Sequence, residues 1–167
     1  MYEDVDWRDL EAIKRLKYKY LRCLDQKRWE EMRECFVPEA TAAYSGGKYS
    51  AQGIDEILAF LVKSMDRETF LSSHRVHHPE IDFVSPTEAT GTWALEDVVI
   101  DRQWEITIQG AAFYEDRYTR GDDGVWRILH TGYLRTYEEI FPRKSIQGLR
   151  ITADFYQTGG RSELDAG

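Results

Sequence analysis

The apolar positions in the first part of the chain recur every three to four residues, which is the spacing of an amphipathic helix. The first stripe predicts a helix over about residues 6–25, with Asp6 or Asp9 capping its start. This stripe consists of Leu10, Ile13, Leu16, Tyr20, Leu21 and Leu24. The pattern also predicts a shorter helix over residues 27–36 and a third helix after Gly53.

After Arg67 the apolar period changes to two, which is typical of β-strands. Four long segments are predicted as strands, over residues 72–84, 87–101, 104–120 and 125–137. Short turns between them predict an antiparallel meander. Strands longer than the usual ~5–6 residues predict a strongly curved sheet with bulges. Before them, residues 40–44 and 48–51 flank Gly46-Gly47 and predict a short hairpin.

Helices followed by a curved sheet predict an α+β fold, in which the helices cover the concave face of a cone-shaped antiparallel sheet. Such a half-closed sheet leaves an internal pocket, where a ligand is expected. The 167 residues fit one domain, which we place at residues 1–140. We expect the tail, residues 141–167, to pack on the body or on a neighbouring subunit.

The charge balance argues against nucleic acid and anionic membranes as partners. Asp and Glu number 30 against 22 Lys and Arg, which gives a net charge of −8, whereas both of those partners attract basic surfaces. No segment has the ~18 apolar residues of a membrane span. The acidic N-terminus is unlike a signal peptide, so we expect a cytoplasmic protein.

Neither metal chemistry nor nucleophilic chemistry has a clear motif in the sequence. Cys23 and Cys35 are not part of a CxxC, which argues against a disulfide framework or a structural zinc site. The chain has no GxSxG, GxGxxG or phosphate loop. We therefore expect no metal and no other cofactor.

All four histidines lie in the stranded half of the chain, at His74, His77, His78 and His130. On a regular strand, His74 and His78 share one face and His77 points away. Two histidines at this spacing need a third ligand from elsewhere to hold a metal. A single histidine that faces a covered pocket fits better as a general base.

Asp25 is the carboxylate that could orient such a histidine. It follows the last residue of the first apolar stripe and stands at the negative end of the helix dipole, where a carboxylate is disfavoured. A carboxylate in that position is either paired or functional, or it caps a second helix that begins at Lys27. The sequence leaves these interpretations about even.

Further polar residues fall on apolar faces of the predicted elements. Tyr20 and Tyr44 could each donate a hydrogen bond to an oxygen that gains negative charge. The commoner role of such a tyrosine is structural, with the ring in the core and the hydroxyl group in contact with water. Asp97 is a lone acid among apolar neighbours on its strand, and Arg135 is its candidate partner. The two form either a pocket pair or a structural ion pair, and the structural interpretation is slightly favoured.

The alternation of side chains along a strand also predicts which residues of the late strands share a face of the sheet. Arg127 and Arg135 should share a face with Thr131 and Tyr133 on the last strand. A group of charged residues is interpreted as a solvated face of the sheet: Glu96, Glu115, Asp116 and Arg117.

In this order, the motifs resemble the SnoaL-like branch of the nuclear transport factor 2-like superfamily. They are the helix end at residues 20–29, the segments 73–81, 91–97 and 110–118, and the late segments around Trp126 and Arg135. Within that branch the sequence is most similar to the scytalone dehydratase and bile acid 7α-dehydratase type. The dehydrochlorinase pattern departs more, because Tyr20 occupies its lysine position.

The resemblance implies a cone-shaped α+β barrel that is commonly dimeric or trimeric. It places an Asp–His dyad at Asp25 and His74, with Tyr20 as a further catalytic residue. It also implies substrate-binding roles for Tyr44, Asp97 and Arg135.

The activity implied by the resemblance is that of a cofactor-independent lyase. The expected reaction is the elimination of water from a small hydrophobic carbonyl compound, polycyclic and steroid- or polyketide-like, by a homodimer or homotrimer. Two alternatives stay open: a non-catalytic small-molecule-binding or assembly module of the same fold, and a ketosteroid-type isomerase.

Overall fold

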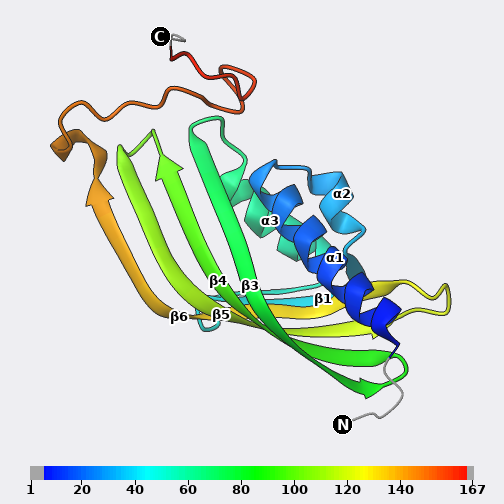
Figure 1. Ribbon diagram of the computed structural model, residues 1–167. Coiled ribbons are helices and arrows are strands. Elements are labelled where there is room, and N and C mark those ends of the chain that lie inside the picture. Colours follow the sequence, from blue (N-terminus) through cyan, green and yellow to red (C-terminus); the bar gives the residue numbers. More distant parts are fainter. Residues whose placement is uncertain (1–5, 165–167) are drawn as a thin grey trace.

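A computed structural model describes residues 6–164 (Figure 1). The helices are α1 (Trp7–Asp25), α2 (Trp29–Arg33) and α3 (Ile54–Met65). The strands are β1 (Phe36–Tyr44), β2 (Tyr49–Gln52), β3 (Phe70–Ser85), β4 (Glu88–Asp101), β5 (Ile106–Arg120) and β6 (Trp126–Pro142). A short 3-10 helix, η1 (Arg143–Ser145), follows β6.

The predicted α+β fold is confirmed, with one pairing that the sequence pattern did not predict. The strand order is β2-β1-β6-β5-β4-β3, and β3 to β6 form the expected antiparallel meander. The exception is β1, which pairs parallel to β6 and makes the sheet mixed. This pairing forms because α3 carries the chain from the β1–β2 hairpin to the opposite edge of the sheet, where β3 begins (Figure 1). The meander then runs back across the sheet, and its last strand, β6, lies next to β1.

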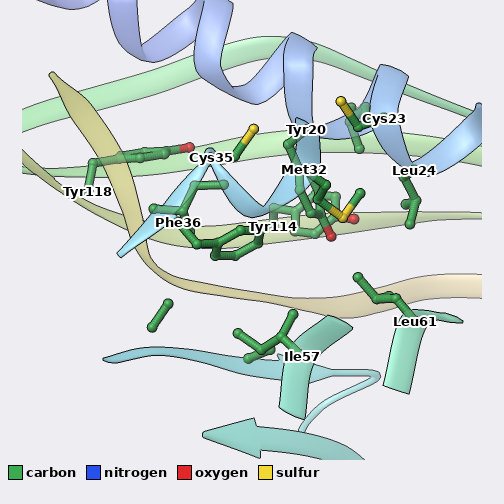
Figure 2. Packing of buried hydrophobic residues seen from close by; sticks show 14 of the residues in the cluster. Tyr20, Cys23, Leu24, Met32, Cys35, Phe36, Ile57, Leu61, Tyr114 and Tyr118 are labelled. Atoms are coloured by element: carbon green, nitrogen blue, oxygen red, sulfur yellow. The ribbon is translucent and has the colours of Figure 1, made fainter. Parts of the chain in front are cut away.

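The helices lie across the concave side of the curled sheet (Figure 1). Asp6 caps α1 by accepting a hydrogen bond from the backbone N–H of Arg8, at 2.9 Å. In the core, α2 and α3 meet α1 and β1 through apolar side chains that include Tyr20, Met32, Phe36, Ile57 and Leu61 (Figure 2). This packing fixes the end of α1, and Asp25 with it, against the sheet.

The second helix is shorter than predicted. It begins at Trp29 because Lys27 adopts a left-handed conformation, with φ 54°, which interrupts the helical path after α1. It ends at Arg33, and Phe36 already belongs to β1. Pro38 favours extended backbone in the residue before it, so the chain enters the strand early.

A bulge in β6 overturns the expected position of Arg127. Arg117 pairs with His130 while Tyr118 pairs with Ile128, so Leu129 is the extra residue on β6. The inward-facing residues of β6 therefore have even numbers before the bulge, as in Trp126 and Ile128, and odd numbers after it, as in Thr131 and Tyr133. Arg127 lies on the other side from Thr131, where it pairs with Asp123 at 2.7 Å.

Asp116 was wrongly assigned to a solvated face. It is only 2% exposed, because it alternates with Tyr114 and Tyr118 on the inner face of β5. Glu115, one residue earlier, is exposed as expected.

The C-terminal tail crosses the ends of the long strands (Figure 1). Asp154 pairs with Arg102 at 3.1 Å, and Lys27 Nζ donates to the Tyr156 hydroxyl at 2.7 Å. The domain boundary at residue 140 stays a prediction. In residues 6–164, no helix is long and apolar enough to cross a membrane.

Candidate active site

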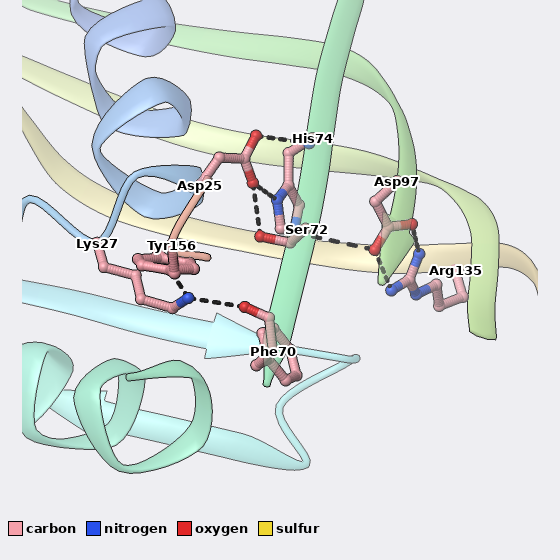
Figure 3. A network of polar contacts seen from close by, with 8 residues as sticks. All are labelled: Asp25, Lys27, Phe70, Ser72, His74, Asp97, Arg135 and Tyr156. Carbon is pink, nitrogen blue, oxygen red and sulfur yellow. Dashed lines mark hydrogen bonds and ion pairs between the residues drawn. The ribbon is translucent and has the colours of Figure 1, made fainter. Parts of the chain in front are cut away.

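Asp25 and His74 meet where the end of α1 contacts β3 (Figure 3). Asp25 Oδ1 lies 2.6 Å from His74 Nδ1, and Asp25 Oδ2 accepts from the His74 backbone N–H at 2.8 Å. The Ser72 hydroxyl adds a third hydrogen bond to Oδ1, at 2.7 Å. The contact forms because β3 is an edge strand, so the N–H groups on its free side are available to a partner outside the sheet.

These contacts favour the interpretation of Asp25 as an orienting carboxylate over that of a helix cap. The N-cap of α2 is Arg28, with no side-chain cap hydrogen bond. The side-chain hydrogen bonds of Asp25 within the described residues all go to Ser72 and His74. Burial raises the pKa of the Asp25 carboxyl, but the hydrogen bonds from His74 and Ser72 outweigh it and hold this pKa below its ordinary value.

The ionised Asp25 determines which nitrogen of His74 carries the proton. A carboxylate only accepts hydrogen bonds, so Nδ1 is the protonated nitrogen and Nε2 presents its lone pair. Nε2 lies 4.0 Å from Asp97 Oδ2, which is beyond hydrogen-bond distance. The lone pair of Nε2 is therefore available to accept a proton.

Asp97 and Arg135 form a bidentate ion pair on the opposite side of His74 (Figure 3). Arg135 Nη1 and Nη2 lie 2.5 and 2.8 Å from the two carboxylate oxygens, and Asp97 is 5% exposed. Burial lowers the pKa of the Arg135 guanidinium, but its hydrogen bonds to Asp97 outweigh this and raise it overall. Both side chains also line the central cavity, so this structural ion pair is part of the pocket wall.

The cavity has a volume of about 360 Å³ and a wall of mainly aromatic and aliphatic side chains. The aromatic lining includes Tyr20, Tyr44, Phe60, Phe70, Tyr114 and Tyr133. The Tyr20 and Tyr44 hydroxyls lie 3.3 Å apart, within reach of a hydrogen bond. Burial raises the pKa of both phenols above the ordinary value, so both hydroxyls stay protonated and can donate.

The structure thus brings most of the predicted site residues to one cavity. Tyr20, Tyr44, His74, Asp97 and Arg135 all line it. Asp25 is not part of the lining and contacts the cavity through His74.

Three residues of the site were missed from the sequence: Ser72, Tyr114 and Tyr133. Ser72 stands two positions before His74, so the period of the strand could have placed both side chains on one face. Tyr114 stands on β5 at a position that alternation places on the inner face of the sheet, so the period of two could have indicated it as well. Tyr133 stands two positions before Arg135 on β6, so the predicted face that they share could have placed Tyr133 in the cavity wall.

The other histidines lie apart from this cavity. His78 was expected on the face of His74, but β3 bulges between His77 and Glu80, and His78 is exposed with φ 45°. His130 Nδ1 contacts the Thr41 hydroxyl at 2.7 Å. Among residues 6–164, no three His, Cys, Asp or Glu side chains gather in a way that could hold a metal ion.

A curled sheet that encloses an apolar pocket beneath N-terminal helices is the cone fold of the nuclear transport factor 2-like superfamily. The chain belongs to the SnoaL-like domain family, whose model matches residues 6–132. The family assigned by resemblance is therefore confirmed.

Solved structures with this fold include enzymes of elimination chemistry. A candidate scytalone dehydratase from Novosphingobium aromaticivorans has a TM-score of 0.71 and 24% identity, with 80% of this chain and 87% of that chain covered. The hexachlorocyclohexane dehydrochlorinase LinA-type3 from Novosphingobium barchaimii has a TM-score of 0.74 and 18% identity, covering 87% and 94%. ActVI-ORFA from Streptomyces coelicolor has a TM-score of 0.65 and 15% identity, covering 76% and 96%. At these identities the likeness establishes the fold.

Proposed function

We propose that this protein is a cofactor-independent lyase that eliminates water from a hydrophobic carbonyl compound, with His74 as the general base and Asp25 as its orienting partner. The observation that carries the proposal is the 2.6 Å contact between Asp25 Oδ1 and His74 Nδ1, with Nε2 beside an apolar cavity and without a hydrogen bond from any residue of 6–164. A binding module needs the cavity, but it does not need an oriented imidazole whose Nε2 lone pair is available there. Two of the similar structures, named as a scytalone dehydratase and as a hexachlorocyclohexane dehydrochlorinase, support the proposal because both names denote elimination reactions.

The reaction begins with removal of a proton from the carbon next to the carbonyl group. His74 Nε2 takes this proton, and the electrons of the C–H bond form the double bond of an enolate. His74 becomes an imidazolium, which the Asp25 carboxylate stabilises through Nδ1–H. Asp25 keeps its negative charge throughout.

The negative oxygen of the enolate needs hydrogen-bond donors in a dry environment. Tyr20 and Tyr44 supply hydroxyl groups in the cavity wall, where the low dielectric strengthens each hydrogen bond. When the carbonyl group re-forms, the bond between the β carbon and its hydroxyl group breaks. The leaving hydroxide takes the proton from the His74 imidazolium, so water leaves and a conjugated carbonyl compound remains.

The cavity restricts which molecules fit. Its aromatic wall favours an apolar ring system, and about 360 Å³ is near the lower end of small-molecule sites. Asp97 lies beside His74 Nε2 and can accept a hydrogen bond from a substrate hydroxyl group, while Arg135 holds Asp97 in place. Tyr44, Asp97 and Arg135 thus have substrate-positioning roles in this proposal.

A screen of β-hydroxy ketones with one to three fused rings tests the proposed function. Elimination produces a conjugated enone, which is detected by its ultraviolet absorbance and by the loss of one water from the mass. We expect turnover by the wild type and none by His74→Ala, with unchanged circular dichroism. Wild-type rates in a folded His74→Ala variant would contradict the dyad.

The same screen separates the two alternative functions. A product of unchanged mass with a moved double bond would identify an isomerase. Binding without any product would identify a binding module.

The homodimer or homotrimer stays a prediction, and we expect its contact on the outer face of the sheet. Phe113 and Leu134 are opposite partners on β5 and β6, and they are 49% and 59% exposed. Light scattering on the wild type and on Leu134→Glu measures the oligomeric state. A monomeric wild type would contradict the prediction.

A further inference from the structure

Lys17 is completely buried behind the wall of the cavity. It lies on α1, one helical turn before Tyr20, and its side chain is 0% exposed. Its Nζ lies 2.7 Å from Asp116 Oδ2, and the Asp116 side chain is also 0% exposed. The proposed dyad uses neither residue.

The Asp116 carboxylate is held by a set of buried donors. Tyr118 donates to Oδ2 at 2.7 Å, and Thr131 donates to Oδ1 at 2.8 Å. Trp93 Nε1 in turn donates to the Tyr118 hydroxyl at 2.9 Å. These contacts fix a negative charge behind the pocket.

The Lys17 ammonium has aromatic rings as its other neighbours. Its Nζ lies 3.3 Å from the centroid of the Tyr114 ring and 4.9 Å from that of Tyr20. Within residues 6–164 it makes no hydrogen bond of good geometry, so the ring faces and the ion pair replace its solvation. Burial lowers the pKa of Lys17, and Asp116 opposes this effect.

The two rings that contact Lys17 belong to residues of the cavity wall. The negative charge of Asp116 raises the pKa of the hydroxyl groups of Tyr20, Tyr44 and Tyr114, in addition to the effect of burial. An uncompensated carboxylate here would disfavour any further negative charge in the cavity. Lys17 is the cation that stands next to it.

We propose that Lys17 is a positioning residue: its ammonium group neutralises the field of Asp116 behind the pocket tyrosines, so that their hydroxyl groups can stabilise a negative oxygen in the cavity. The proposal rests on the proposed function only in taking the cavity as the place where that oxygen forms. Stability alone gives no reason for such a pair, because apolar side chains of similar volume often replace buried ion pairs without loss.

Two probes of similar shape test this role without turnover. 4-Nitrophenolate carries a negative oxygen at about pH 8, and 4-nitroanisole is its neutral analogue. We would measure the affinity of the full-length protein for each probe by titration. In Lys17→Met, we expect affinity for 4-nitrophenolate to fall about tenfold, with affinity for 4-nitroanisole within about twofold of wild type.

The Asp116→Asn variant is the matched control, because a counter-charge and a structural pair predict different signs for it. We expect it to bind 4-nitrophenolate more tightly than wild type does, and the double variant Lys17→Met/Asp116→Asn to return close to wild type. Equal loss of affinity for both probes in Lys17→Met, or no gain in affinity for 4-nitrophenolate in Asp116→Asn, would overturn the proposal.

Failure of Lys17→Met to fold, seen by circular dichroism, leaves the decision to the comparison of Asp116→Asn with the double variant. A gain in affinity for 4-nitrophenolate in Asp116→Asn that the double variant loses again supports the counter-charge, and equal affinities in these two variants reject it. Absence of turnover on every carbonyl substrate would contradict the proposed function and leave these affinities unchanged. The two failures are therefore distinguishable.

Discussion

Asp25 holds His74 at two points, with Oδ1 on the ring Nδ1 at 2.6 Å and Oδ2 on the backbone N–H at 2.8 Å. One carboxylate thus fixes both the orientation of the imidazole and the position of β3 against the end of α1. The unfavourable interaction of Asp25 with the helix dipole is offset by three hydrogen bonds from one strand. Asp25 should therefore affect both catalysis and stability, and each effect can be measured by itself.

Replacement of Asp25 by Asn should reduce turnover by at least about a hundredfold, because the amide no longer selects the Nδ1–H tautomer of His74 or stabilises the imidazolium. Ser72→Ala removes one hydrogen bond to the same carboxylate and should have a much smaller effect. Steady-state kinetics on the substrate found by the screen compare the two variants. Equal effects would contradict the orienting role of Asp25.

The contribution of Asp25 to the stability of the protein should be lost only in acidic solution, below the ordinary pKa of a carboxyl group. The pKa of this carboxyl is below its ordinary value in the folded state, so its contribution is fully present above that ordinary value. The contribution is lost as the pH falls through the folded pKa. Urea unfolding midpoints from about pH 6 to pH 3 should therefore show the advantage of wild type over Asp25→Asn shrinking at the acidic end. A difference that does not change with pH would exclude this linkage.

Arg135→Met should destabilise the protein by about 3 kcal/mol, because it leaves the Asp97 carboxylate buried without its partner. The double variant Asp97→Leu/Arg135→Met removes both charges and should recover most of that loss. Chemical unfolding gives the free energy of unfolding for each variant. A double variant as unstable as Arg135→Met would show that the loss comes from packing.

Both cysteines should resist thiol reagents in the folded protein. Cys23 and Cys35 are free and buried, and burial raises the pKa of the Cys35 thiol to about 12. At about pH 8 the reactive thiolate is therefore scarce as well as inaccessible. Absorbance after addition of Ellman's reagent should rise only when urea is added. Rapid reaction of the folded protein would show that the helices open locally.

The elements that the sequence predicted well are those that local patterns determine. The apolar stripe and Asp6 predicted α1 almost to the residue, and the period of two located β3 to β6. The parallel pairing of β1 with β6 brings together distant segments, and the bulge at Leu129 depends on the register with β5. Neither the parallel pairing nor the bulge can be recognised from a short segment of the sequence.

The same distinction applies to the site. The position of Asp25 at a helix end showed that its carboxylate was unusual, and the resemblance paired it with His74. Only the tertiary contact could decide between an orienting group and a helix cap. Asp116 was misassigned because its charge was given more weight than its parity with Tyr114 and Tyr118.

The bulge at Leu129 divides β6 into two segments of opposite parity. Before it, Trp126 and Ile128 face inward with the core, and after it Tyr133 and Arg135 face the cavity. Deletion of Leu129 would make the pairing of β6 with β5 regular at this point and leave Arg135 opposite Ala112, so the cavity would keep its cation. The strand can therefore gain or lose this one residue in descendants of the sequence, while the core packing before it and the cavity wall after it are both inherited unchanged.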